Sequence, residues 1–197
     1  NPWFTHANSA IGDDGALLSG WEMRYARHPA RVDERHSETA YTTDRAIEFI
    51  AGQGDAPWCL HLSYIKPHWP YVAPSPYHGL FSSDDVVPAV RHPSEQSDPH
   101  PILRSYHQHE ASLSFSQDVV RETVIPVYMG LIKQIDDQLG RLFEMLTRNG
   151  RWSDTMVVFC SDHGDYLGDH YLGEKELFHD VAIRTPLIVY DPSPSAD

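Results

Sequence analysis

An aspartate and a histidine stand side by side directly after an apolar run that is typical of a buried strand. The run is Val157–Cys160, and Asp162, His163 and Gly164 follow it. Carboxylates and imidazoles are common metal ligands, and Gly164 would permit the bend that turns two neighbouring side chains toward one ion. An imidazole ligand favours Mn, Zn or Fe over Ca or Mg. The alternative is a polar loop in which Asp162 caps a turn.

A lysine follows the same motif in the chain. Lys175 lies thirteen residues after Asp162 and is one of three lysines, with Lys66 and Lys133. Its ammonium group suits an anionic oxygen of a substrate. The alternative is a solvated surface lysine, which is the commoner role for this residue type.

A histidine between prolines is the third candidate. His68 lies between Pro67 and Pro70, where the backbone has little conformational freedom. A histidine held in this way could act as a general acid toward a leaving group. The alternative is a packing cluster of aromatic residues and prolines that leaves His68 exposed.

No nucleophile is recognisable from the sequence. Cys59 and Cys160 both lie in apolar runs without a neighbouring cation that would activate them. The chain has no G-x-S-x-G elbow, P-loop or dinucleotide fingerprint. Two cysteines without a CxxC motif predict buried free thiols in a reducing compartment, which favours the cytoplasm.

The elements around these residues alternate between helix and strand. Residues 43–50 predict a helix capped by Thr43, which buries Ala46, Ile47, Phe49 and Ile50 and ends at Gly52 and Gly54. Residues 58–65 alternate as in a strand, 128–146 carry the spacing of an amphipathic helix, and 155–160 and 186–190 read as strands. This order predicts an α/β fold, a mostly parallel sheet flanked by helices.

The remaining segments and the composition limit the class of protein. We interpret 1–197 as a single α/β domain, with 1–36 irregular, 66–120 a long proline-rich excursion and 121–192 a helix, a strand, the metal loop and a strand. The net charge of −13 argues against nucleic acid and anionic membranes as partners. No apolar run approaches the roughly 18 residues that cross a bilayer, so we expect a soluble protein.

Several motifs together resemble the sulfatase and phosphonate monoester hydrolase family of the alkaline phosphatase superfamily. In family order they are SETAYTTDRAIEFI, HLSYIKPHWPYVAP, YMGLIKQIDDQLGRLFEML, VVFCSDHGDYLGDHYLGEK and AIRTPLIVYDP. The resemblance spans residues 37–192, is weakest across 88–120, and implies part of an alkaline-phosphatase-like sandwich.

The resemblance also implies roles for individual residues. Asp162 and His163 match two metal ligands of the family, and His163 is similar to the phosphonate hydrolase branch, whereas many arylsulfatases have Asn there and bind Ca²⁺. Mn²⁺ is therefore expected before Ca²⁺, and Zn or Fe also fits. His68 matches a general acid for the leaving group, and Lys175 matches a residue that stabilises charge on the substrate.

The family's nucleophile has no counterpart here. It is a formylglycine made from a C/S-x-P-x-R motif, which occurs nowhere in the 197 residues. We therefore expect a fragment of a longer hydrolase that is inactive alone, acts on small anionic esters and binds metal weakly. Homo-oligomerisation is left open. The alternatives are a sulfatase proper and a non-catalytic α/β domain with a structural metal.

Overall fold

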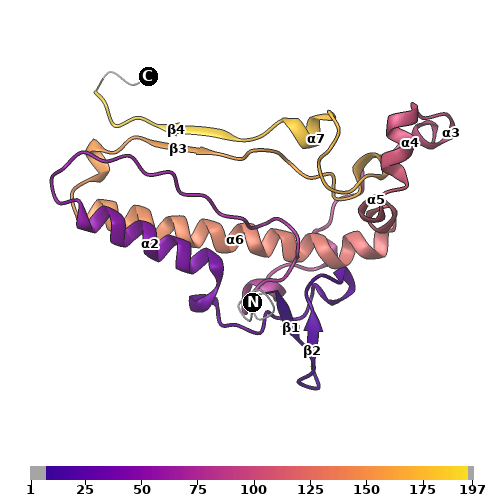
Figure 1. The fold of residues 1–197 in the computed structure, drawn as a ribbon, viewed down its shortest axis with the longest axis horizontal. Coiled ribbons are helices and arrows are strands. Elements are labelled where there is room, and N and C mark those ends of the chain that lie inside the picture. Colours follow the sequence, from indigo (N-terminus) through magenta and orange to yellow (C-terminus); the bar gives the residue numbers. More distant parts are fainter. Residues whose placement is uncertain (1–7, 195–197) are drawn as a thin grey trace. The chain divides into compact units, whose positions relative to one another are not determined.

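The computed structural model describes residues 8–194, and residues 1–7 and 195–197 are outside the described range (Figure 1). The strands are β1 (Ser9–Ile11), β2 (Leu17–Ser19), β3 (Val157–Cys160) and β4 (Leu187–Tyr190). The helices are α2 (Glu38–Gly52), α3 (Ser94–Ser97), α4 (Pro101–His107), α5 (Glu110–Phe115), α6 (Asp118–Arg148) and α7 (Asp180–Ile183).

The chain divides into two compact units. The first contains the residues up to Asp85 together with Pro126–Ser153, and the second contains Val86–Ile125 and the residues from Asp154 on. Helix α6 begins in the second unit and continues in the first. None of the described helices is both long and apolar enough to span a bilayer.

A short hairpin opens the first unit, where the sequence predicted only irregular structure. Strands β1 and β2 pair antiparallel, with Ala10 opposite Leu18. The turn is closed by a hydrogen bond from the Gly12 N–H to the Ala16 carbonyl at 2.9 Å. Each strand has three residues, too few for an alternating pattern to be recognised in the sequence. The part of this prediction that concerns residues 1–7 falls outside the described range.

The N-cap of helix α2 lies six residues before the predicted cap. Ser37 is the N-cap, and its hydroxyl accepts from the Ala40 N–H at 3.2 Å. Thr43 is buried inside the helix, where its hydroxyl contacts the Thr39 carbonyl at 3.0 Å and the Tyr64 hydroxyl at 2.8 Å. The prediction of Thr43 as the cap was wrong because Ser37 offers the same chemistry one and a half turns earlier.

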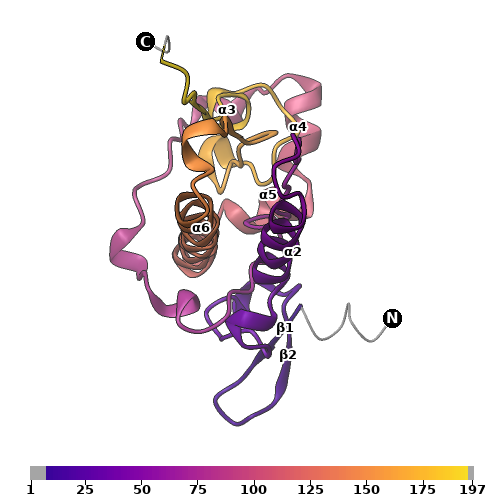
Figure 2. The ribbon, with the colours of Figure 1, turned by 90° about the vertical axis from the view of Figure 1, so that its left-hand side faces the viewer.

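The core of the first unit lies between α2 and α6, which run side by side (Figures 1 and 2). Ile50, Leu142 and Leu146 form its buried centre. Phe49, a predicted core residue, is 40% exposed instead, and Ile132 of the predicted amphipathic helix 128–146 is 47% exposed. They lie at the margin of the apolar stripe, where helical spacing alone does not distinguish burial from exposure.

Residues 58–65 are extended but form no strand, which corrects the prediction. The expected alternation is present, because Trp58, Leu60 and Leu62 pack on the helical core while Cys59 and His61 are exposed. Within residues 8–194 no strand pairs with this segment. The alternating pattern therefore predicted correctly which side chains of residues 58–65 face the core. A strand also requires hydrogen bonds to a neighbouring strand, which the pattern does not indicate.

Two glycines of α6 offer a matched test of its packing. A Cβ atom at the buried Gly130 would overlap the carbonyl oxygen of Tyr77, whereas one at Gly140 would meet nothing within 4 Å. We expect Gly130→Ala to lower the free energy of unfolding by about 1–3 kcal/mol. Gly140→Ala should raise it by up to about 1 kcal/mol through helix propensity. Urea denaturation measures both, and equal effects of the two substitutions would contradict the close approach of Tyr77.

The second unit contains a β-ribbon whose geometry differs from the predicted one. β3 and β4 pair antiparallel, with Val158 opposite Val189, although parallel pairing was predicted. The predicted burial was also wrong, because Val158 is 56% exposed and Cys160 is an exposed free thiol, as is Cys59. Two strands leave both faces of a ribbon open unless another layer packs on them, and no further strand joins this ribbon in the described part of the chain.

Helices occupy much of the second unit between Val86 and Ile125. α4, α5 and the first turns of α6 occupy much of 101–125, a region in which the sequence shows only a proline-rich excursion and an indistinct pattern. Phe115 is completely buried, and Tyr166, Leu172 and Ala182 form a separate apolar cluster. Tyr166 and Leu172 belong to the loop that follows β3, so this cluster supports the residues of the candidate site.

Candidate functional site

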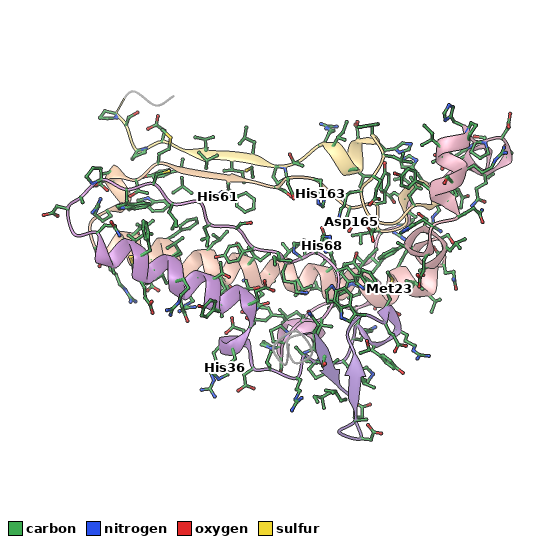
Figure 3. All side chains as sticks on the ribbon, in the orientation of Figure 1. Met23, His36, His61, His68, His163 and Asp165 are labelled. Carbon is green, nitrogen blue, oxygen red and sulfur yellow. The ribbon has the colours of Figure 1, made fainter. Side chains whose placement is uncertain are left out.

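Asp162 and His163 form a paired group just after the end of β3, and Figure 3 labels His163. Oδ1 of Asp162 accepts from the His163 backbone N–H at 3.0 Å, which fixes the carboxylate against the turn. The other oxygen, Oδ2, lies 3.6 Å from Nε2 of His163. Nδ1 of His163 is 2.7 Å from the Gly164 carbonyl oxygen. Because a carbonyl only accepts, Nδ1 carries a hydrogen, and Nε2 is the ring nitrogen that lies beside Asp162.

This arrangement fits a divalent metal ion. Two ligand atoms that each lie about 2.0–2.2 Å from one ion are normally about 3–4 Å apart, which includes the observed separation. Metal-binding histidines commonly donate their second ring N–H to a backbone carbonyl, as His163 does. Among residues 8–194, no third His, Cys, Asp or Glu completes the set. The described residues therefore supply two candidate ligands, and the Asp162 side chain is 85% exposed.

Gly164 serves a different purpose from the one predicted. Its φ angle is not among the positive values in the described chain, so the turn does not depend on glycine's conformational freedom. Instead its N–H donates to the Ala182 carbonyl at 2.7 Å, and a Cβ atom would overlap the Val181 carbonyl oxygen. Gly164 thus allows α7 to approach the turn at Asp162 and His163 closely.

The loop that follows Asp162 and His163 folds back on itself, so that Glu174, next to Lys175, lies beside Tyr166 near the start of the loop. The Tyr166 N–H donates to the Glu174 carbonyl at 2.8 Å, which closes the loop directly before Lys175. A second bond, from the Gly168 N–H to the Leu172 carbonyl at 2.8 Å, closes it further out. The closed loop Tyr166–Glu174 therefore makes up most of the chain between Asp162 and Lys175 in the second unit.

Two arginines that the sequence analysis missed hold the tip of this loop. Arg121 of α6 is 5% exposed and donates to the Leu167 carbonyl at 3.0 Å. Arg91 donates to the Gly168 carbonyl at 2.7 Å and to the Phe115 carbonyl at 2.7 Å. Nothing in the residues around either arginine indicates these partners, and the burial of Arg121 becomes evident only in the structure, where arginine is seldom buried unless paired.

A cluster of histidines braces the other side of the loop. His170 bonds to Glu95 at 2.7 Å and stacks on His179 with ring centroids 4.1 Å apart, while His179 bonds to the Tyr166 hydroxyl at 2.8 Å. Burial, together with the positive charge that His170 can carry, lowers the pKa of His179. Asp169 accepts from the Val90 N–H at 2.9 Å. Asp169 and His170 therefore both tie the loop to the segment around residues 90–95.

His68 belongs to the first unit, at the end of the extended segment 57–65 (Figure 3). Its side chain is exposed, and Nδ1 lies 2.7 Å from the Trp69 carbonyl oxygen. Nδ1 must therefore donate, which makes Nε2 the nitrogen that can bind or release a further proton. Trp69 packs edge-to-face on Trp21 with centroids 5.1 Å apart, so an aromatic cluster is present beside an exposed histidine.

Known proteins share these motifs and this fold. The Sulfatase family model matches residues 12–196. The multifunctional alkaline phosphatase superfamily protein PehA of Trinickia caryophylli is 35% identical over 83% of this chain and 34% of its own length. Choline-sulfatase of Rhizobium meliloti is 30% identical over 96% of this chain and 36% of its own length.

Solved structures extend the similarity to the fold. Phosphonate monoester hydrolase SpPMH from Silicibacter pomeroyi superposes with a TM-score of 0.83 at 28% identity, covering 95% of this chain and 38% of that one. The phosphonate monoester hydrolase of Agrobacterium radiobacter gives 0.78 at 30% identity, covering 84% and 35%. The chain thus spans about a third of the length of these relatives, and its α/β fold is part of an alkaline-phosphatase-like domain. The chain belongs to the sulfatase family.

Proposed function

We propose that the chain is the later part of the catalytic domain of a longer, metal-dependent hydrolase of phosphonate, phosphate or sulfate esters. The observation that carries this proposal is the pair Asp162 and His163, whose Oδ2 and Nε2 atoms lie 3.6 Å apart. The backbone bond of His163 to Gly164 leaves Nε2 available as a ligand atom. The similarity to phosphonate monoester hydrolases supports the ester as substrate.

Asp162 and His163 would bind the metal. When bound, a divalent ion supplies Lewis-acid stabilisation of anionic oxygens. The imidazole ligand favours Mn²⁺ over Ca²⁺, with Zn or Fe also compatible. Since the described residues supply two ligands, further ligands would come from elsewhere in the longer protein, and we expect the isolated chain to bind Mn²⁺ with a Kd weaker than about micromolar.

Lys175 and His68 would act on the substrate. Lys175 directly follows Glu174, the last residue of the closed loop, and is proposed to stabilise negative charge on the transferred group. His68 is proposed to protonate the departing alkoxide or phenoxide from Nε2, since Nδ1 donates to Trp69. The attacking group is proposed to be a formylglycine outside these 197 residues, which contain no C/S-x-P-x-R motif.

A sulfatase proper is the second candidate. Choline-sulfatase of Rhizobium meliloti matches nearly the whole chain at 30% identity, so the family relationship does not by itself select phosphonate over sulfate. His163 favours the phosphonate branch, because an imidazole is a poor partner for the Ca²⁺ that an oxygen ligand set would bind. Both candidates act on small anionic esters, and the substrate distinguishes them.

The test is made on the longer hydrolase with Mn²⁺ present. Turnover of an aryl phosphonate monoester and of the matching aryl sulfate is compared in the same buffer. We expect the phosphonate to be hydrolysed faster, by about tenfold or more in kcat/KM, which corresponds to about 1.4 kcal/mol of differential transition-state binding. A preference for the sulfate would assign the chain to the sulfatases proper, and turnover of neither would favour a non-catalytic domain with a structural metal.

The cytoplasm remains our proposal for the location. Cys59 and Cys160 are exposed free thiols, which a reducing compartment keeps from oxidation. The net charge of −13 remains an argument against nucleic acid and anionic membranes as partners.

A further inference from the structure

Three consecutive carbonyl groups around His68 are bound by side chains of the same segment. Nζ of Lys66 donates to the Pro70 carbonyl at 2.5 Å and to the His68 carbonyl at 3.4 Å. Between them, the Trp69 carbonyl accepts from Nδ1 of His68 at 2.7 Å. Lys66 therefore binds the carbonyls on either side of the one that orients the His68 ring.

The position of the Trp69 carbonyl decides which ring nitrogen of His68 is bound to the backbone. As long as Nδ1 donates to this carbonyl, Nε2 is the atom at which the reacting proton is bound or released. A rotation of the peptide that carries the Trp69 carbonyl would remove this acceptor from Nδ1. The exposed His68 ring could then adopt other rotamers and tautomers. Restraining the two flanking carbonyls opposes that rotation.

Lys66 is more buried than a lysine that serves only solubility. Burial lowers the pKa of Lys66 to about 8, and the negative charge of Glu38 offsets part of this shift. A small cavity of about 30 Å³, room for roughly one water, is lined by Lys66, Glu38 and Gln134 among others. A buried ammonium group is unfavourable unless its hydrogens find acceptors, and here the acceptors are carbonyls of the His68 turn.

We propose that Lys66 is a positioning residue that fixes the Trp69 carbonyl, and through it the His68 ring, in the orientation from which Nε2 delivers a proton. The inference rests on the general-acid role proposed for His68. It assigns to the first lysine of the chain a function that differs from the charge stabilisation proposed for Lys175.

The test compares Lys66→Met with wild type in the longer hydrolase, because methionine keeps an unbranched side chain of similar length and removes the donors. For an ester with an alkyl leaving group we expect kcat to fall about 10²-fold with little change in KM. For a p-nitrophenyl ester, whose leaving group needs little protonation, the loss should be less than about tenfold. Lys66→Arg, which retains donors, should recover most of the activity on the alkyl ester.

A double-mutant cycle separates positioning from a general structural effect. In a His68→Ala background, adding Lys66→Met should cost less than about threefold, because the residue it positions is gone. Equal losses on both esters, or a full loss in the His68→Ala background, would overturn the proposal. Lys133→Met is the matched control, since Lys133 is a surface lysine of the first unit that pairs with Asp136 and Asp137, and it should leave both rates unchanged.

Two further results distinguish this inference from the proposed function. If His68→Ala shows leaving-group dependence and Lys66→Met does not, the general-acid role stands and the positioning role is overturned. If His68→Ala shows none, both are overturned. Should Lys66→Met fail to fold, ¹⁵N shifts of the His68 ring in the wild-type protein decide: an Nδ1–H tautomer supports the bond to Trp69, and an Nε2–H tautomer overturns the proposal.

Discussion

His68→Ala is expected to lower kcat of the longer hydrolase about 10²–10⁴-fold toward esters with poor, alkyl leaving groups, and much less toward p-nitrophenyl esters. An alkoxide is a strong base that must be protonated as it departs, whereas p-nitrophenolate leaves readily as the anion. The exposed position of His68 and its Nδ1 bond to the Trp69 carbonyl leave Nε2 to make that transfer. The measurement is a plot of log kcat against leaving-group pKa, which should become steeper in the variant.

His61 provides the control for this experiment. It is an exposed histidine in the extended segment 57–65, seven residues before His68. His61→Ala should leave both the rates and the slope of the plot unchanged. If His68→Ala lowered the rates of alkyl and p-nitrophenyl esters by the same factor, His68 would contribute to binding or to folding, and the general-acid role would be lost.

Asp162→Ala is expected to lower kcat/KM about 10³-fold or more, together with a loss of bound Mn²⁺. The variant removes Oδ2, one of the two proposed ligand atoms in the 3.6 Å pair, and leaves His163 as the single proposed ligand on this chain. Lewis-acid stabilisation of a transition state contributes several kcal/mol, and each 1.36 kcal/mol corresponds to about tenfold in rate. Metal content by elemental analysis and turnover are measured on the same sample.

Asp180→Ala provides the matched control. Asp180 is an exposed carboxylate of the same unit that pairs with Arg184 at 3.3 Å, so its loss changes the net charge without touching the pair of Asp162 and His163. It should leave metal content and turnover unchanged. A companion variant, His163→Asn, should weaken Mn²⁺ more than Ca²⁺, because an amide oxygen replaces an imidazole. Full Mn²⁺ binding by Asp162→Ala would refute the assignment of Asp162 as a ligand.

Local patterns in the sequence predicted several features correctly. The three- and four-residue spacing in 128–146 lies entirely within α6, and α2 ends at Gly52 as expected. The alternation in 58–65 identified which side chains face the helical core. These features depend on neighbours in the chain, since the period of the backbone sets which side chains share a face.

The motifs of the chain likewise indicated its family correctly. Several segments in a fixed order, with the spacing from Asp162 to Lys175 retained, resemble the sulfatase family, to which the chain belongs. The pair Asp162 and His163 was also selected from sequence, because adjacent residues must lie close together in any fold. What a motif does not contain is the set of contacts that holds it in place.

Those contacts were decided by the tertiary structure. Arg91 and Arg121 reach the carbonyls of a loop some fifty to eighty residues further along the chain, and nothing local to either arginine specifies that partner. The sequence predicted that Gly164 permits a bend of the backbone, whereas the structure shows that glycine is needed there for the close approach of α7. Burial of β3 and the direction of its pairing also depended on other segments, and both predictions were wrong.

Sequence alone therefore determined the family, the main helices and the choice of Asp162 and His163 as candidate ligands, because each of these follows from residue type and short-range spacing. Tertiary structure decided the register of β3 on β4, the bracing of the loop from Asp165 to Lys175, and the contact of Lys66 with the carbonyls beside His68. The physical reason is that hydrogen bonds and packing between distant segments depend on positions in space, which short-range patterns do not encode.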